Sequence, residues 1–549
     1  MNLADNPRWR EACQRVDEAA SLIENARLGI LDGVWEAREY WSAAACRWLE
    51  GEEDLEVVLE AAEGFVSAVE AVVPPYALRP VYPFNDSDEP VLLYAGPMSV
   101  MLEQTSAEPI QGIEARGESR VYFEFLPTPR VTWQTVVEVV HSDLLGAFFS
   151  PTREKPVFPQ FGEPQFAVPP DSGTVADLPN VKDRGGMDLT GIVSSEQVGD
   201  SDQLSTIRFN LINFPLERGT DLVLHPYGDR STSEEISKAP KYWLASHRLR
   251  LHADGWEVDI DARRDISDIW KQTEDRGSFA FTHTGRVRCL NLSTFSFEQA
   301  KDLLNALHWF LSFVMGARVG IALPVGFDHC GIPICTEWSS PVVDAPMSYI
   351  GWRHDLVSAD LPALFEVFHR YWKDEYWQGV IRQVVDAYTF AKKDTPRDKV
   401  VTTQTALETL AWAVLVIDHK WLTKREFKSL ASAARIRRLL EWAGVPTEVP
   451  ADQSALAVKA QSMKGHRDGP QAIAWVRNKI VHPTPSPAKG RISRKVWLEA
   501  HRVALWYLEM VLLRLFEYRG DYVNWPKGMG SGAGLSDCIE KVPWATSEP

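Results

Sequence analysis

Cysteine is scarce in this chain of 549 residues, with six cysteines scattered from Cys13 to Cys538. This scatter lacks the spacing of a disulfide framework, and a chain of this length can bury hydrophobic cores that need no cross-links. Free thiols persist in reducing compartments. We therefore expect reduced cysteines and a cytoplasmic protein.

Long apolar runs are also missing. The segment Trp309–Ala317 is bracketed by His308 and Arg318, and the segment Val503–Leu513 contains Glu509. Neither approaches the roughly 20 apolar residues of a membrane-spanning helix. The N-terminus is polar and acidic where a secretory signal would be apolar. We therefore expect no membrane partner.

Several catalytic signatures are absent. The sequence contains no Gly-Lys dipeptide for a phosphate-binding loop and no G-x-S-x-G, H-E-x-x-H or C-x-x-C motif. His329, Cys330 and Cys335 place three soft ligands within seven residues. Their spacing is loose and no fourth ligand is evident. We expect no metal and no cofactor, although metal binding by Cys330 and Cys335 stays open.

Charge is unevenly distributed. The formal net charge is −17, which argues against a general polyanion binder. Residues 1–100 hold 7 Arg and no Lys against 19 Asp and Glu, whereas residues 419–519 hold 19 Lys and Arg against 8 Asp and Glu. A basic C-terminal segment predicts a local surface for a polyanion. The alternative is a basic helical face that is only solvated.

The sequence pattern predicts a multidomain α+β protein. Apolar residues recur at helical spacing in residues 1–75, and short β-branched and aromatic runs with strand-like alternation fill residues 76–350. Helical periodicity returns in residues 351–525, and a glycine-rich stretch makes residues 526–549 a predicted flexible tail. We interpret the middle part as a sensor or regulatory domain. Helices are expected near 297–315, 360–372, 375–391, 397–418, 424–443, 451–463, 468–482 and 493–518.

The segment Arg477-Asn478-Lys479-Ile480-Val481-His482 is an R-x4-H motif. Four Arg/His pairs in the chain have a spacing of four to six residues, so the bare pattern is weak and context must decide. In this pair a polar amide follows the arginine, and the pair ends the penultimate helix of an all-helical domain. Asn478 and His482 fall nearly opposite the apolar face made by Ile473, Val476 and Ile480, so we expect them to be exposed. The alternative is an arginine and a histidine that merely decorate a helix end.

This context resembles the HEPN-domain ribonucleases, whose motif is R-x4–6-H. The resemblance covers the C-terminal 170 residues or so and implies an all-α helical bundle that acts as a nuclease. It makes Arg477, Asn478 and His482 the catalytic residues. Glu408 resembles an acidic residue on an earlier HEPN helix and becomes a supporting residue. HEPN nucleases dimerise so that two motifs face one groove, which implies a homodimer or a higher homo-oligomer.

The chemistry suits these residue types. RNA carries its own nucleophile, the 2′-hydroxyl beside the scissile phosphate. A histidine can act as acid or base near neutral pH, and a guanidinium can stabilise charge on the phosphate oxygens. Cleavage therefore needs no metal ion. The basic residues that flank the motif in sequence are candidate RNA contacts: Lys464, Arg467, Lys479, Arg491 and Arg494.

The whole chain is also similar to the ApeA-like anti-phage proteins, which carry a HEPN domain after a long strand-rich region. The segments Gly255–Ile260, Thr282–Gly285 and Phe310–Gly316 carry this similarity. It implies abortive infection: a toxin, activated by a phage-derived trigger, that cleaves host RNA, with tRNA as one implied target. These expectations make the protein an endoribonuclease of antiviral defence.

Two other functions remain open. The first is a non-catalytic HEPN scaffold that binds RNA or a partner. The second is a ligand-binding sensor in residues 76–350 with the helical domain as its dimeriser, because 21 tryptophans could include exposed rings that stack on a ligand.

Overall fold

The computed structural model describes residues 32–49, 54–72, 90–102, 113–137, 158–161, 187–193, 195–215, 221–226, 242–346, 351–353, 360–393, 396–482, 492–527 and 535–545, with isolated positions 8, 12, 13, 16, 78 and 80–82. The fold is mixed α/β, with antiparallel sheets and a helical C-terminal region, as the sequence predicts at this coarse level. Two compact units are present. Unit 1 comprises Met1–Arg79, Leu216–Arg250 and Asp259–Ile266, and unit 2 comprises Pro80–Pro215, Leu251–Val258 and Ser267–Pro549.

Unit 1 contains a helix pair and a strand pair. Helices α2 (Asp32–Leu49) and α3 (Leu55–Val72) pack through the small buried side chains of Ala44, Ala45 and Ala61, with Val58 between them. Small residues at such a contact let two helix backbones approach closely. Strand β8 (Asp221–Pro226) pairs antiparallel with β9 (Tyr242–Ala253).

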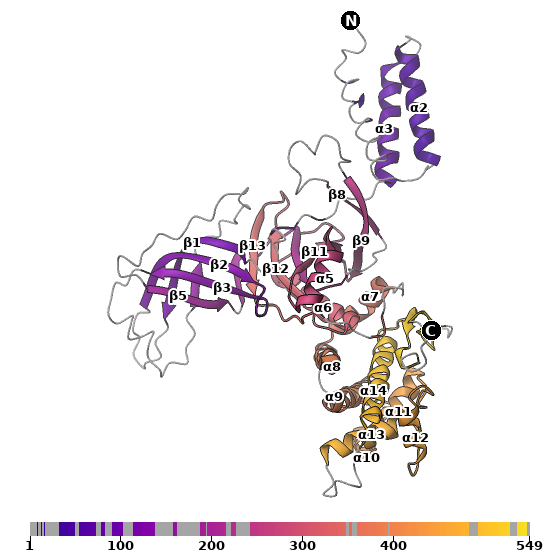
Figure 1. The fold of residues 1–549 in the computed structure, drawn as a ribbon. Coiled ribbons are helices and arrows are strands. Elements are labelled where there is room, and N and C mark those ends of the chain that lie inside the picture. Colours follow the sequence, from indigo (N-terminus) through magenta and orange to yellow (C-terminus); the bar gives the residue numbers. More distant parts are fainter. Residues whose placement is uncertain are drawn as a thin grey trace. The chain divides into compact units, whose positions relative to one another are not determined.

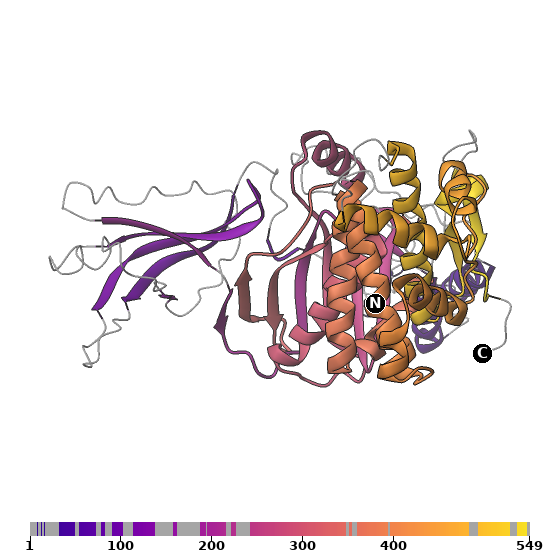
Figure 2. The ribbon, with the colours of Figure 1, turned by 90° about the horizontal axis from the view of Figure 1, so that it is seen from below.

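Unit 2 contains two antiparallel sheets. The smaller has the order β4-β1-β2-β3-β5, and Figure 2 shows its long strands side by side. The larger has the order β6-β13-β12-β7-β11 within unit 2, and strands β9 and β10 each have residues in both units. The bounds are β1 (Val91–Leu102), β2 (Ile113–Glu124), β3 (Arg130–Val137), β4 (Phe158–Phe161), β5 (Met187–Val193), β6 (Ser195–Gly199), β7 (Thr206–Ile212), β10 (Trp256–Ala262), β11 (Phe281–Cys289), β12 (Gly320–Phe327) and β13 (Pro333–Ser339).

Alternation explains the core of unit 2. Along β2 and just beyond it, Val121, Phe123 and Phe125 are buried while Tyr122 and Glu124 are half-buried. The buried set packs in one cluster with side chains of the larger sheet, such as those of Phe281 and Trp338. Strand periodicity of two places every second residue on the same face, so the predicted strand character of this region follows from the apolar residues on one face.

Helix α6 (Phe297–Met315) matches the predicted helix at 297–315 and has signals at both ends. Ser296 caps the start in a capping box with Gln299, and Gly316 ends it in the left-handed region at φ 65°. A glycine adopts this conformation without a Cβ penalty. Helix α5 (Ile266–Arg276) lies between β10 and β11 in sequence.

The C-terminal helices follow the predicted series closely (Figure 1). The predicted helix 424–443 is instead two helices, because Leu430 takes an extended conformation with ψ 138° and interrupts the hydrogen-bond ladder. The bounds are α7 (Leu361–Trp372), α8 (Glu375–Lys393), α9 (Pro396–Trp412) with a π-helical extension η3 (Ala413–Asp418), α10 (Lys424–Ser429), α11 (Ser432–Ala443), α12 (Ser454–Gln461), α13 (Gly469–Val481) and α14 (Arg494–Leu515).

The predicted flexible tail is wrong for the residues that the structure describes. Strand β15 (Ile539–Lys541) pairs with β14 (Asp521–Val523), and the short turns η4 (Trp525–Lys527) and η5 (Leu535–Cys538) lie between them in sequence. Val542 and Trp544 are buried. These buried apolar side chains hold the segment in place. The prediction of flexibility relied on the glycine content of the tail and did not consider them.

One helix in the described part of the chain, Arg397–Asp418, is long and apolar enough to cross a membrane. Its most apolar window is 61% buried inside the protein, as a core helix would be.

Candidate functional site

Helix α13 is held firmly at its N-terminus. Asp468 caps it by accepting the amide of Gln471 at 3.0 Å, and the same carboxylate pairs with Arg437 of α11 at 2.7 Å. Gly469 passes so close to Tyr507 of α14 that a Cβ would lie 2.1 Å from the tyrosine oxygen. The helix therefore has a fixed position against α11 and α14. Because a helix is stiff, this anchor also sets the position of its C-terminal end.

The far end carries the predicted catalytic residues. Ile473 and Val476 are fully buried, whereas Asn478 and His482 are exposed, as the helical spacing predicts. Ile480, the third member of the apolar face, is half-buried. The helix ends before Pro483, with the amide of His482 donating to the carbonyl of Asn478 at 2.9 Å.

Arg477 and Asn478 are in contact. Arg477 is half-buried and donates from Nη1 to Oδ1 of Asn478 at 3.3 Å. His482 lies one helical turn further on, so the three side chains occupy one exposed end of α13. A guanidinium, an amide and an imidazole at the surface can together bind a phosphate and exchange protons with it.

Glu408 has other partners. Its carboxylate, on α9, accepts from Ser432 at 2.6 Å and pairs with Arg435 of α11 at 3.0 Å, and Gln404 donates to it at 3.2 Å. Among the described residues no hydrogen bond or ion pair joins Glu408 to the α13 motif. Its observed role is to connect α9 with α11.

The predicted RNA contacts are accessible where they are described. Lys464 and Arg467 are exposed in the turn before α13, Arg494 is exposed at the start of α14, and Lys479 is half-buried. Arg491 lies outside the described residues. These positions flank the motif in sequence on both sides.

A basic segment with an exposed tryptophan was missed by the sequence reasoning. Lys420, after η3, and Lys424, Arg425 and Lys428, on α10, are all exposed, and Trp421 is 58% exposed. We call these five residues the Trp421 patch. The sequence signal was present, since basic residues with an interleaved aromatic are typical of single-strand binding. Choosing candidate RNA contacts by their nearness in sequence to residues 477–482 leaves this segment out.

The other Arg/His pairs provide a contrast. In Arg494/His501, burial lowers the pKa of His501 to about 3, so the ring is neutral at physiological pH. His283, of Arg276/His283, is buried at 1% exposure. Arg218 of the remaining pair lies outside the described residues. Only His482, among the histidines of these pairs whose side chains are described, is exposed.

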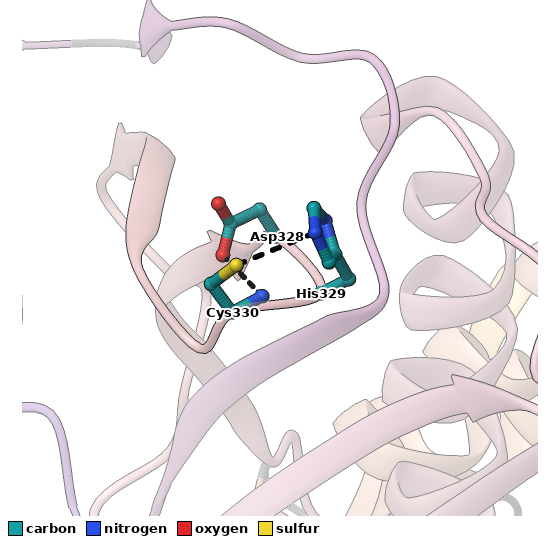
Figure 3. Close-up of side chains that lie close together, drawn as sticks. All are labelled: Asp328, His329 and Cys330. Carbon is teal, nitrogen blue, oxygen red and sulfur yellow. Dashed lines mark hydrogen bonds between the residues drawn. The ribbon is translucent and has the colours of Figure 1, made fainter.

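The three soft ligands noted in the sequence do not come together. Cys335 is buried in β13, and burial raises the pKa of its thiol to about 12, which disfavours the thiolate that a metal needs. Asp328 instead joins His329 and Cys330 in the turn between β12 and β13 (Figure 3). The carboxylate of Asp328, two positions before Cys330 in sequence, is the third potential ligand of this group.

A cavity of about 230 Å³ lies between α6 and strands β12 and β13. Lys301 and Glu337 form an ion pair of 2.9 Å at its wall. His308 also lines it; its Nδ1 is 2.7 Å from the carbonyl of Val319, and burial lowers its pKa. A neutral ring with Nδ1 donating would leave Nε2 as an acceptor.

Comparisons with known proteins assign two parts of the chain to one family. The model of the YopA central domain matches residues 199–349, and that of the YopA C-terminal domain matches residues 374–532. The chain is 30% identical over 307 residues to the SPbeta prophage-derived uncharacterized protein YopA of Bacillus subtilis (strain 168), covering 55% of this chain and 67% of that protein. No solved structure matches. The chain belongs to the YopA family.

Proposed function

We propose that residues 351–525 form a HEPN-type endoribonuclease that acts from the cytoplasm in anti-phage defence. The observation that carries the proposal is the exposed end of α13, where Arg477 contacts Asn478 and His482 is open to solvent. An exposed helix end that carries a guanidinium, an amide and an imidazole can bind a phosphate. A prophage origin of the relative is compatible with a role in conflict between phages.

The proposed reaction begins with attack of the RNA 2′-hydroxyl on the adjacent phosphorus. His482 takes or gives the proton, Arg477 stabilises the negative charge on the phosphorane oxygens, and Asn478 orients the phosphate. The bond to the 5′-oxygen breaks and that oxygen receives a proton. The products are a 2′,3′-cyclic phosphate and a 5′-hydroxyl.

The product ends test this chemistry. We expect RNA from phage-infected cells that express the protein, and RNA treated with the purified protein, to carry cyclic phosphate and 5′-hydroxyl ends. Cleavage should persist in EDTA because the nucleophile belongs to the substrate. Terminal 5′-phosphates, or a strict need for magnesium, would contradict the mechanism. Matched DNA, which lacks the 2′-hydroxyl, is the uncleaved control.

A dimer would supply the second acid or base. One motif offers one imidazole, whereas the reaction moves two protons. We therefore expect a homodimer or a higher oligomer in which two copies of the segment 477–482 face one basic groove. Mass measurement in solution and inactivation by a charge reversal such as Arg494→Glu check this. An active monomer would exclude the shared groove.

A further inference from the structure

The turn between β12 and β13 has a tightly defined backbone. The amide of Asp328 donates to the carbonyl of Ile332 at 3.0 Å, and the amide of Gly331 donates to the carbonyl of Asp328 at 3.1 Å. Gly331 takes φ 76°, which suits a glycine at the bulge that follows such a turn. His329 and Cys330 are therefore the two central residues of the turn.

Hydrogen bonds also orient the Asp328 side chain. Its Oδ1 accepts the amides of Cys330 at 2.9 Å and Ile332 at 2.8 Å. The hydroxyl of Ser205 donates to the Asp328 carbonyl at 2.6 Å and ties the turn to the residue before β7. Oδ2 receives no hydrogen bond from the residues that the structure describes. Metal-binding carboxylates are commonly oriented in this way by a second layer of hydrogen bonds.

Three different donor atoms converge at this turn. Sγ of Cys330 is 3.3 Å from Nε2 of His329, and the donor atoms of Asp328, His329 and Cys330 lie within 4.8 Å of one another (Figure 3). Zinc–ligand bonds of about 2.0 to 2.3 Å at tetrahedral angles separate a sulfur from a nitrogen donor by roughly 3.6 Å. Small side-chain rotations therefore suffice to surround one ion.

We propose that Asp328, His329 and Cys330 bind a zinc ion. A thiolate and an imidazole favour a borderline-soft divalent ion and disfavour calcium and magnesium. The carboxylate and the thiolate balance the two positive charges of the ion. Cys330 and His329 are exposed, so a fourth position stays open to water. The site belongs to the central strand-rich region and does not depend on the α13 motif.

Cobalt(II) gives a direct test because it replaces zinc and absorbs in the near ultraviolet when a thiolate binds it. We expect the reduced full-length protein to bind one Co²⁺ per chain with this band, and Zn²⁺ to displace it. Calorimetry in two buffers of different ionisation enthalpy should show that a proton is released as the thiol binds the metal. Absence of the band at saturating Co²⁺ would overturn the proposal.

Matched variants separate a designed site from a reactive thiol. Cys330→Ser should abolish the band, whereas Cys46→Ser, at another exposed cysteine, should leave it unchanged. Asp328→Asn keeps the oxygen that accepts the two turn amides but removes the anionic ligand, so affinity should fall at least tenfold while the fold is retained. His329→Ala should also weaken binding at least tenfold. A band that is unaffected by both Asp328→Asn and His329→Ala would reduce the site to a lone thiol and overturn it.

Discussion

Charged side chains in the C-terminal region are used in two opposite ways. Between α8 and α14, Lys392 and Glu509 lie 3.7 Å apart with side chains that are 4% and 1% exposed. Tyr388 and Trp525 donate to Glu509 at 2.6 and 2.8 Å. At the end of α13, by contrast, His482 has no protein partner for its ring among the described residues. The charges of the first group are enclosed and paired with each other, whereas the ring of His482 is accessible to a ligand.

The buried group is tightly fitted. A Cβ at Gly316 or at Gly351 would lie 2.1 or 2.5 Å from Nζ of Lys392, so both positions leave room only for that ammonium. Burial raises the pKa of Glu509 and lowers that of Lys392, while each charge partly offsets the effect on the other. Charges enclosed in this way link helices. They cannot reach a substrate.

The largest effect should come from the exposed group. We expect Arg477→Ala or His482→Ala to reduce RNA cleavage by about 10²- to 10⁴-fold, since each removes a proton-transfer or charge-stabilising group. His482→Ala should change the free energy of unfolding by less than about 0.5 kcal/mol because His482 is exposed. Cleavage assays and thermal unfolding measure both. His501→Ala, at the half-buried histidine of a similar motif, should do the reverse and mainly change stability.

An outcome in which His482→Ala cleaves RNA at the wild-type rate would exclude the motif from the reaction. If His482→Ala lost both cleavage and folded protein, His482 would have a structural role like that of Lys392 and Glu509. The contrast between the buried group and the exposed end of α13 would then fail.

The buried group should show its effect in stability. Lys392→Met leaves the Glu509 carboxylate without its cation, and breaking a buried pair in this way costs about 3–5 kcal/mol. Denaturant unfolding measures the loss. The double variant Lys392→Met/Glu509→Gln removes both charges and should recover part of it. A double variant that loses the sum of the two single effects would show that the pair does not interact.

The stability of the single variant Lys392→Met should also depend on pH. Without Lys392 the pKa of Glu509 in the folded protein is raised further above its unfolded value of about 4.3. A raised pKa means that the folded protein favours the protonated carboxyl. The folded state of Lys392→Met is therefore most stable below the unfolded pKa of Glu509, and it loses stability as the pH rises through the folded pKa. The deficit of Lys392→Met relative to wild type should therefore grow from acidic to neutral pH.

Local signals made the α13 end predictable. The apolar spacing of Ile473 and Val476 fixed which side is buried, and the proline after His482 fixed where the helix ends. Contacts between residues that are distant in sequence could not be predicted from these local signals. Glu509 accepts a hydrogen bond from Tyr388, which is 121 positions away in sequence. Glu408 pairs with Arg435 on another helix, whereas the resemblance implies a supporting residue of the nuclease. Cys335 was grouped with Cys330 by spacing, but strand geometry turns it into the core.

The smallest of these effects should come from the Trp421 patch, which extends the exposed group to substrate binding. The ring of Trp421 lies 5.7 Å from that of His419, which in turn accepts a hydrogen bond from Trp442 at 3.0 Å. Trp421 is thus supported on one side while remaining 58% exposed. Four basic residues and one acidic residue, Glu426, surround it between positions 420 and 428, which gives a net charge of +3.

An exposed indole among lysines suits a stacked base with its phosphates alongside. We expect Trp421→Ala to weaken binding of single-stranded RNA by about 1–3 kcal/mol, the usual contribution of one stacked base. Lys424→Ala should instead lower the salt dependence of binding by about one phosphate contact. Tyr376→Ala is the control, because Tyr376 is 40% exposed and follows Asp374 and Glu375. If wild type and Trp421→Ala bound RNA equally at all salt concentrations, the ring of Trp421 would not contact RNA. Exposure alone would then not identify the residues that contact the substrate.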